Sequence, residues 1–392
     1  MKDIIVSPSV IYIGVDDNEL DLFESQYDVP NGMAYNSFVI IDEKVCVMDT
    51  SDSRVAEIWL GNLEFALQGR KPDYLVVDHV EPDHSGAIAM LLEKYPDIVL
   101  VGNAKSFVFL EQFYPGLKCE KLTVKEGDTL SLGTHTLSFI MAPMVHWPEV
   151  MMTYESSERL LFSADAFGKF GTLDTEEDWA CEARRYYFNI CGKYGAQVQA
   201  VLKKIAALDI DMILPLHGPL LKESLGYYVK LYNTWSLYEP ENKGIFIACA
   251  SIHGNTLAAA EKLKEMLEAR GAEKVSLSDL TRDDLAEAIE DAFRYDRLVL
   301  MSASYDGGVF PIMEDLLCHL RAKNYQNRKI AIVENGSWAP SAGRVIKGYT
   351  EQLKNITMIE PMVTIKSALN SESEAALAKL ADALTAAPAF ED

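Results

Sequence analysis

The chain has 392 residues and a formal net charge of −23, with 49% apolar and 24% charged residues. Its length favours two domains rather than one, and its composition is ordinary for a soluble globular protein. The strong negative charge argues against binding to nucleic acid or to anionic membranes. Because no apolar run reaches about 18 residues, we expect no membrane-spanning helix.

The cysteines and the N-terminus bear on the cellular compartment. The six cysteines contain no Cys-x-x-Cys pair, which excludes a zinc-ribbon type of thiolate site. Cys46 and Cys249 lie in strand-like apolar runs and are expected to be buried. The N-terminal MKDIIVSPSV lacks a basic region followed by a long apolar stretch, so we expect no signal peptide. These features favour a cytoplasmic protein.

The first 240 or so residues mix hairpin patterns with strand–helix units. A hairpin turn is expected at Asp42-Glu43-Lys44, and KLTVKEGDTLSLG is expected to pair with HTLSFIMAP. VMMTYES and RLLFSAD form a further expected pair. The expected helices cover residues 53–68, 87–94, 104–113, 176–190, 195–208 and 219–238. This order predicts sheets packed face to face with helices outside.

The pattern changes at the polar stretch Glu239–Gly244. From Ile245 onward, five strand patterns alternate with five helical patterns, joined by short connections. The expected helices cover 255–270, 282–293, 311–323, 342–354 and 372–386. Strict alternation predicts a doubly wound parallel sheet of flavodoxin type. We place the boundary near residue 243, so the expected domains are 1–243 and 244–392.

The stretch His79-Val-Glu81-Pro-Asp83-His84 carries four groups of metal-ligand type. It follows the apolar run Tyr74–Val77, which reads as a buried parallel strand. Further candidates each end another apolar run: His146, Asp165 and His217. One such residue alone is usually a core or capping group, but seven at four strand ends indicate a metal site. Mixed imidazole and carboxylate ligands suit iron or manganese, although zinc remains an alternative.

A second candidate site lies in the loop between the first strand and first helix of the second domain. Its residues are Ser251, Ile252, His253, Gly254, Asn255 and Thr256. Small and hydroxyl residues before a helix N-terminus favour phosphate binding. The loop has no lysine and matches neither a Walker motif nor Gly-x-Gly-x-x-Gly, which favours a monophosphate. Alone, the loop could equally be an ordinary turn with a capping hydroxyl.

Two later loops strengthen the prediction of a ligand site in the second domain. Both follow strands, both are glycine-rich, and each carries an aromatic residue. One contains Ser304, Tyr305, Asp306, Gly307 and Gly308, and the other contains Asn335, Gly336, Ser337 and Trp338. For either aromatic alone, packing against the sheet is the simpler interpretation. A planar ring between these loops, with its phosphate in the first loop, describes FMN.

The residues as a set resemble the flavodiiron proteins, also called A-type flavoproteins. The resemblance covers nearly the whole chain and rests on His-x-Glu-x-Asp-His, on the later His, Asp and His, and on Phe162–Gly168. It implies a metallo-β-lactamase-like αββα sandwich followed by a flavodoxin-like domain. It implies that His79, Glu81 and His146 bind one iron. Asp83, His84 and His217 would bind the other, and Asp165 would bridge them.

The resemblance also implies an activity and partners. The expected cofactors are FMN and two non-haem irons, and the expected reactions are reduction of O2 to water, of NO to N2O, or both. The expected electron donor is rubredoxin or a reduced F420-type coenzyme. The expected assembly is a head-to-tail homodimer or a dimer of such dimers. Charge supports the iron assignment, because three carboxylates balance two ferrous ions once one hydroxide bridges them.

Two other functions compete with this hypothesis. The first is a metal-dependent hydrolase of the β-lactamase superfamily with a fused flavodoxin-like domain. Glu81 argues against it, because the hydrolases usually carry histidine at that place. The second is an electron-transfer module with a structural metal site. Seven potential ligands argue against it, because a closed structural site needs fewer.

Overall fold

The structure, a computed structural model, describes residues 4–386. It divides into two compact units. The first comprises residues up to Tyr187 together with Ala196–Asn233, and the second comprises Phe188–Gly195 and the chain from Thr234 onward. The domain boundary at residue 243 stays a prediction. Among the described residues, no helix combines the length and apolarity needed to cross a membrane.

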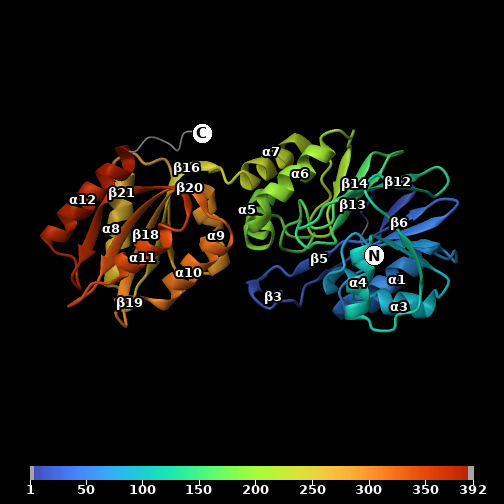
Figure 1. The fold of residues 1–392 in the computed structure, drawn as a ribbon, viewed down its shortest axis with the longest axis horizontal. Helices are drawn as coiled ribbons and strands as arrows, with labels where there is room; N and C mark the ends of the chain where they lie inside the picture. Colours follow the sequence, from blue (N-terminus) through green and yellow to red (C-terminus); the bar gives the residue numbers. More distant parts are fainter. Residues whose placement is uncertain (1–3, 387–392) are drawn as a thin grey trace. The chain divides into compact units, whose positions relative to one another are not determined.

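Two sheets form the centre of the first unit (Figure 1). The first, in spatial order, contains β1 (Val10–Tyr12), β6 (Phe38–Ile41), β7 (Val45–Met48), β8 (Tyr74–Val76), β9 (Val99–Gly102) and β10 (Glu120–Thr123). The second contains β11 (Thr129–Ser131), β12 (Thr136–Met141), β13 (Met151–Glu155), β14 (Leu160–Phe162) and β15 (Met212–Leu214). Phe38 and Met48 of the first sheet share a buried core with Phe139 and Phe162 of the second, as in a sandwich.

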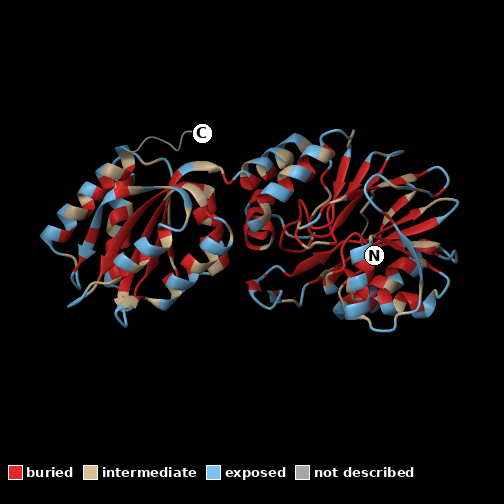
Figure 2. Cartoon of the chain, in the orientation of Figure 1, coloured by how far each residue is buried: buried red, intermediate tan, exposed pale blue. Residues whose placement is uncertain are grey.

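Helices lie outside the two sheets, with their outer faces exposed and their inner faces buried (Figure 2). They are α1 (Ala56–Leu67), α3 (Ile88–Lys94), α4 (Ala104–Phe113), α5 (Trp179–Tyr186), α6 (Gly195–Ile205) and α7 (Leu225–Ser236). The single turn α2 (Pro82–Ser85) is mostly buried. Short 3-10 turns cover Ser53–Val55 and Gly192–Tyr194, and a π-helical turn covers Tyr187–Cys191. Two small antiparallel pairs were not expected: β2 (Val15–Asp17) with β5 (Met33–Tyr35), and β3 (Leu22–Phe23) with β4 (Tyr27–Asp28).

Most expected elements of the first unit are present, including the hairpin of β6 and β7. The predicted pairing of KLTVKEGDTLSLG with HTLSFIMAP is wrong in its first half. β10 pairs with β9 in the first sheet, and only β11 pairs with β12. Gly127, at φ +79°, allows the turn by which the chain leaves one sheet and enters the other. The helix expected from residue 219 begins only at Leu225, because Leu221 still bridges to Ile213 of β15.

The second unit is a parallel sheet with helices on both faces. Its strands are, in spatial order, β17 (Val275–Asp279), β16 (Asn242–Ala250), β18 (Tyr295–Tyr305), β20 (Gln326–Asn335) and β21 (Lys354–Ile365), with β19 (Gly308–Val309) paired to β18. Its helices are α8 (Asn255–Ala269), α9 (Leu285–Arg294), α10 (Pro311–Ala322), α11 (Ala342–Thr350) and α12 (Ser371–Ala386). α8 and α12 share one apolar core with the sheet. The predicted flavodoxin-type fold is confirmed.

Candidate metal centre and flavin pocket

The seven predicted metal ligands lie just beyond the C-terminal ends of four strands of the first unit. His79 and Glu81 follow β8, and Asp83 and His84 lie on the single turn of α2 that comes next. The other three follow the second sheet: His146 after β12, Asp165 after β14 and His217 after β15. β12, β14 and β15 run in the same direction, so their ends meet at one edge of the sheet.

The structure gathers these side chains into two adjoining groups. One group contains His79, Glu81, His146 and Asp165, and the other contains Asp83, His84 and His217. Within each group, one potential ligand atom per residue lies within 4.8 Å of the others. Six of the seven residues are buried, and Glu81 is partly buried. We call the group of His79, Glu81, His146 and Asp165 the first metal position, and the group of Asp83, His84 and His217 the second metal position.

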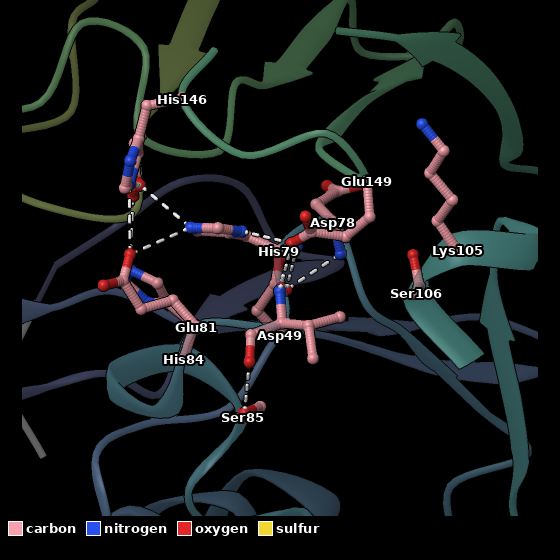
Figure 3. A network of polar contacts seen from close by, with 12 residues as sticks. Asp49, Asp78, His79, Glu81, His84, Ser85, Lys105, Ser106, His146 and Glu149 are labelled. Atoms are coloured by element: carbon pink, nitrogen blue, oxygen red, sulfur yellow. Dashed lines mark hydrogen bonds and ion pairs between the residues drawn. The ribbon is translucent and has the colours of Figure 1, made fainter. Parts of the chain in front are cut away.

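Nitrogen and oxygen atoms point inward at the first position (Figure 3). Glu81 Oε2 lies 3.2 Å from His79 Nε2 and 3.0 Å from His146 Nε2. Asp165 Oδ2 lies 3.3 Å from His79 Nε2 and 3.0 Å from His146 Nε2. Two imidazoles and two carboxylates therefore face one point.

The second position has the same kind of arrangement. Asp83 Oδ2 lies 3.1 Å from His84 Nε2 and 3.2 Å from His217 Nε2. Asp165 Oδ1 lies 3.2 Å from His84 Nε2 and 3.6 Å from His217 Nε2. One oxygen of Asp165 thus faces each position, which is the arrangement of a carboxylate that bridges two ions.

A cavity of about 420 Å³ lies in the second unit at the C-terminal ends of its strands. This volume falls in the usual range for small-molecule sites. Its lining residues are Ile252, His253, Asn255, Thr256, Ala303, Ser304, Tyr305, Asp306, Gly307, Asn335, Gly336, Ser337, Trp338, Ala339, Ser341 and Ser367. Among the described residues, no lysine or arginine lines it, so backbone amides and hydroxyls are the available partners for a phosphate. The rim carries Trp338, which is 92% exposed.

Three predicted flavin contacts do not line this cavity. Ser251 Oγ accepts a hydrogen bond from Gly254 N at 3.1 Å and so closes the loop. Gly254 adopts φ +85° at the N-terminus of α8, a conformation that favours glycine. Gly308 O accepts a hydrogen bond from Ser341 Oγ at 2.7 Å. These residues shape the loops. Ile252 of the predicted phosphate loop lines the cavity, and so do Ala303, Ala339, Ser341 and Ser367, none of which was predicted as a flavin contact.

Comparisons with known proteins agree with this architecture. A family model described as ODP family beta lactamase matches residues 33–218. A nitric oxide reductase of Moorella thermoacetica is 29% identical over 380 residues, which are 93% of this chain and 94% of that one. The flavodiiron protein of Giardia intestinalis superposes with a TM-score of 0.89 at 24% identity, covering 98% of this chain and 97% of that one. Rubredoxin oxygen:oxidoreductase from Desulfovibrio gigas gives 0.89 at 22%, covering 97% and 96%.

The chain is similar to flavodiiron proteins over nearly its whole length, and residues 33–218 match the ODP beta lactamase model. The fold predicted from the sequence, a metallo-β-lactamase-like sandwich followed by a flavodoxin-like domain, is confirmed. In a flavodiiron protein, the two adjoining groups are the candidate diiron centre, and the cavity beside α8 is the candidate FMN site.

The chemistry of the candidate diiron centre fits metal ions. Both oxygens of Asp83 and Oδ1 of Asp165 are buried without a hydrogen-bond partner among the described residues. A buried carboxylate oxygen in that state is costly unless a cation satisfies it. Imidazole and carboxylate ligands suit iron or manganese.

The pKa values of the site indicate which groups carry protons when no metal ion is bound. Burial disfavours the charged form of His84 and His146, but nearby carboxylates outweigh it and raise their pKa values to about 10 and about 9. Burial likewise opposes ionisation of Asp165, but the facing imidazoles hold its pKa well below the usual range. Without an ion, protons therefore balance the carboxylates. A metal ion supplies the same positive charge, so we expect its binding to release protons.

Glycine allows the ligand-bearing loops of the first unit to lie close together. A Cβ atom at Gly168 would lie 3.0 Å from Asp165 O and 3.4 Å from His217 Cβ. His217 is also oriented from behind, because its Nδ1 lies 2.8 Å from Ala34 O, which accepts its N–H. A side chain at residue 168 would therefore push the loops that carry Asp165 and His217 apart by a few tenths of an ångström.

One residue of the candidate diiron centre was missed by sequence reasoning. The fully buried carboxylate of Glu149 lies 2.7 Å from His79 Nδ1, on the side of the ring opposite to the first position. Its signal in the sequence was weak: it is a single acidic residue in the stretch His146-Trp-Pro-Glu-Val150, three places after a predicted ligand.

Proposed function

We propose that this chain is an oxidoreductase that reduces O2 to water, NO to N2O, or both, with electrons passed through FMN to a non-haem diiron site. The observation that carries the proposal is Asp165, whose two oxygens face two separate groups of imidazole and carboxylate ligands. In the proposed site, His79, Glu81 and His146 hold one iron, and Asp83, His84 and His217 hold the other.

The protein's own residues supply a buried, nearly neutral setting for this chemistry. Four imidazoles and three carboxylates carry a charge of −3, which two ferrous ions and one hydroxide balance. Two ferrous ions and reduced FMN together store four electrons, the number that O2 needs to become two water molecules. Two electrons and two protons suffice to convert two NO molecules into N2O and water.

We propose further that the FMN phosphate binds the loop before α8 and that the ring binds between the loops of Tyr305 and Trp338. The cavity supports this placement because all of its lining residues come from these loops and from Ser367. The proposed domains are residues 1–243 and 244–392. The proposed donor is a rubredoxin-type protein or a reduced F420-type coenzyme. The proposed location is the cytoplasm, in keeping with six cysteines that contain no Cys-x-x-Cys pair.

The alternative function is metal-dependent hydrolysis, which the match to a β-lactamase family model favours. Purified protein decides between the two. The proposed function predicts a yellow protein with one FMN and two irons per chain. It also predicts consumption of O2 or NO when a chemically reduced rubredoxin is supplied. Colourless, zinc-containing protein that hydrolyses a lactam or thioester and consumes neither gas would establish the alternative.

A further inference from the structure

The two metal positions have the same ligand types but different surroundings. Each offers two imidazoles and one carboxylate of its own, and they share Asp165. Because the ligand sets match in type and charge, a difference between the positions must come from what lies behind the ligands. Outer partners of this kind change metal affinity by about 10–100-fold.

Behind the first position lies a buried carboxylate. His79 Nε2 faces Glu81 and Asp165, so its other nitrogen, Nδ1, carries the proton and donates to Glu149 Oε1 at 2.7 Å. The ring of His79 faces Glu149 (Figure 3). Both side chains are 0% exposed. A carboxylate that accepts this proton increases the basicity of the imidazole and fixes the orientation of its ring.

Glu149 is itself held in place from two directions. Its Oε1 also accepts a hydrogen bond from Val80 N at 3.1 Å, in the loop that carries His79. Its backbone carbonyl accepts a hydrogen bond from Asn103 Nδ2. Glu149 lies three residues after His146, so it links the two loops that supply both imidazoles of the first position.

The second position has no such carboxylate among the residues that the structure describes. His217 Nδ1 donates to the neutral carbonyl of Ala34 at 2.8 Å. His84 Nδ1 is buried and has no hydrogen-bond partner in that part of the chain. The nearby buried carboxyls bind other groups: Asp49 Oδ1 accepts from the backbone amides of Asp78 and His79, and Asp78 accepts from Thr153 Oγ1.

We propose that Glu149 makes the first position bind its metal ion more tightly than the second, so that the two ions of the centre are gained and lost in a fixed order. This inference rests on the proposed diiron site and deepens it. The buried carboxylate adds negative charge next to the first ion in a medium that screens it poorly. Behind the second position, the buried carboxyl of Asp49 accepts from backbone amides and forms no hydrogen bond with His84. Its contribution there is therefore weaker, and the second ion leaves first.

The test uses full-length protein freed of metal and titrated with Co²⁺, whose binding is followed by its visible absorption. Asp83→Ala leaves the first position intact, and Glu81→Ala leaves the second intact. We expect Asp83→Ala to bind Co²⁺ about 10–100-fold more tightly than Glu81→Ala. Adding Glu149→Gln to Asp83→Ala should remove most of that advantage, whereas adding it to Glu81→Ala should leave Co²⁺ binding unchanged.

Glu149→Gln keeps the size of the side chain and one acceptor oxygen, so the change is chiefly one of charge. Thermal unfolding of each metal-free variant checks that it folds. If Glu149→Gln does not fold, the Co²⁺ affinities of Asp83→Ala and Glu81→Ala can still be compared. That comparison tests which position binds its ion more tightly when Glu149 is present. Equal or reversed affinities in that pair, or equal weakening of both by Glu149→Gln, would overturn the inference. Wild-type protein that binds fewer than two Co²⁺ per chain would instead contradict the diiron proposal itself.

Discussion

Asp165 is the one side chain on which both metal positions depend. Its Oδ2 faces His79 and His146, and its Oδ1 faces His84. We predict that Asp165→Asn lowers iron from two per chain to well below one and abolishes O2 and NO reduction, because the amide provides neither the charge nor the second anionic oxygen. FMN content should stay at the wild-type value, because every residue that lines the cavity belongs to the second unit.

Iron and flavin in the purified variant are measured by elemental analysis and by absorbance. The matched control is Asp97→Asn, an exposed aspartate, which should keep both cofactors. Full iron content in Asp165→Asn would contradict the bridging role.

A buried histidine outside the metal centre gives a prediction about pH. His135 Nδ1 lies 2.7 Å from Asp42 Oδ2, and its Nε2 lies 3.2 Å from Glu158 Oε1. Burial opposes protonation of His135, but the two carboxylates outweigh it and raise its pKa. Burial also opposes ionisation of Asp42, yet hydrogen bonds from His135 hold the Asp42 pKa at about 2.

The raised pKa of His135 means that the ion pair stabilises the fold fully below the unfolded pKa of about 6.5 and is lost as pH rises through the folded pKa. The lowered pKa of Asp42 means that the ionised carboxylate stabilises the fold above its unfolded pKa of about 3.9. This stabilisation is lost as pH falls through the pKa of Asp42 in the folded state. We predict that Asp42→Asn costs about 1.5–3 kcal/mol at pH 5 and less at pH 9. Urea unfolding of wild type and variant at both pH values checks this, and a constant difference would refute it.

At the scale of single residues, the sequence was most informative where chemistry marks a strand end. All seven predicted metal ligands come together because each follows an apolar run, and parallel strands bring their ends to a common edge. Glu149 could not be found in this way, because nothing in its sequence says which imidazole lies behind it. Asn335 was predicted as a flavin contact, yet its amide also binds Thr256 and Ser367, which a sequence pattern cannot reveal.

At the scale of elements, regular alternation was easier to interpret than the hairpins. The five main strands and five helices of the second unit lie close to their predicted bounds, because strands and helices alternate regularly and the central strands β16, β18 and β20 are mostly buried apolar runs. The two-residue strands β3 and β4 were missed because so short a pair has no detectable period. The helix predicted to reach residue 190 changes to a π-helical turn at Tyr187, where the chain passes into the second unit.

The start of the second domain gives a prediction at this scale. Arg328 is fully buried, and its Nη1 donates to Tyr238 O at 2.6 Å. Burial lowers the pKa of Arg328 to about 10, so the guanidinium stays charged at neutral pH and depends on its carbonyl acceptors. A fragment of residues 244–392 lacks Tyr238. We predict that it is less stable than a fragment of residues 234–392 by about 1.5–3 kcal/mol.

Urea unfolding of the two fragments measures the difference, and flavin fluorescence measures FMN binding. Both fragments should bind FMN, because the described residues that line the cavity all lie between Ile252 and Ser367. Arg328→Gln introduced into both fragments is the control, and it should shrink the stability difference. Folded fragments without affinity for FMN would contradict the proposed flavin site.

At the scale of the whole molecule, the proposed electron route joins residues of different units. The candidate metal ligands belong to the first unit, and the candidate flavin cavity belongs to the second. We propose that the route runs between chains in a head-to-tail homodimer, so that the FMN of one chain serves the irons of its partner. Such an interface would be isologous, with two equivalent iron–flavin pairs per dimer.

Mixed dimers test this route. One parent carries His84→Ala and lacks a complete diiron site, and the other carries Asn255→Asp and Thr256→Val and lacks FMN. Each parent should be inactive alone. After dissociation and reassociation, a mixed dimer should regain one working pair, because the second parent's irons then lie beside the first parent's FMN. Steady-state consumption of O2 and NO is measured with reduced rubredoxin, and mixed dimers are isolated through two affinity tags.

A chain that carries all three changes separates transfer between chains from transfer within one. Paired with a wild-type chain, it offers neither FMN to the wild-type irons nor irons to the wild-type FMN. Transfer between chains therefore predicts an inactive mixed dimer, whereas transfer within a chain predicts half of the wild-type activity per dimer. The first experiment reverses these values: half for transfer between chains and none for transfer within one. Because each route predicts opposite results in the two pairings, half activity in the triple-change dimer together with none in the first pairing would refute the head-to-tail route.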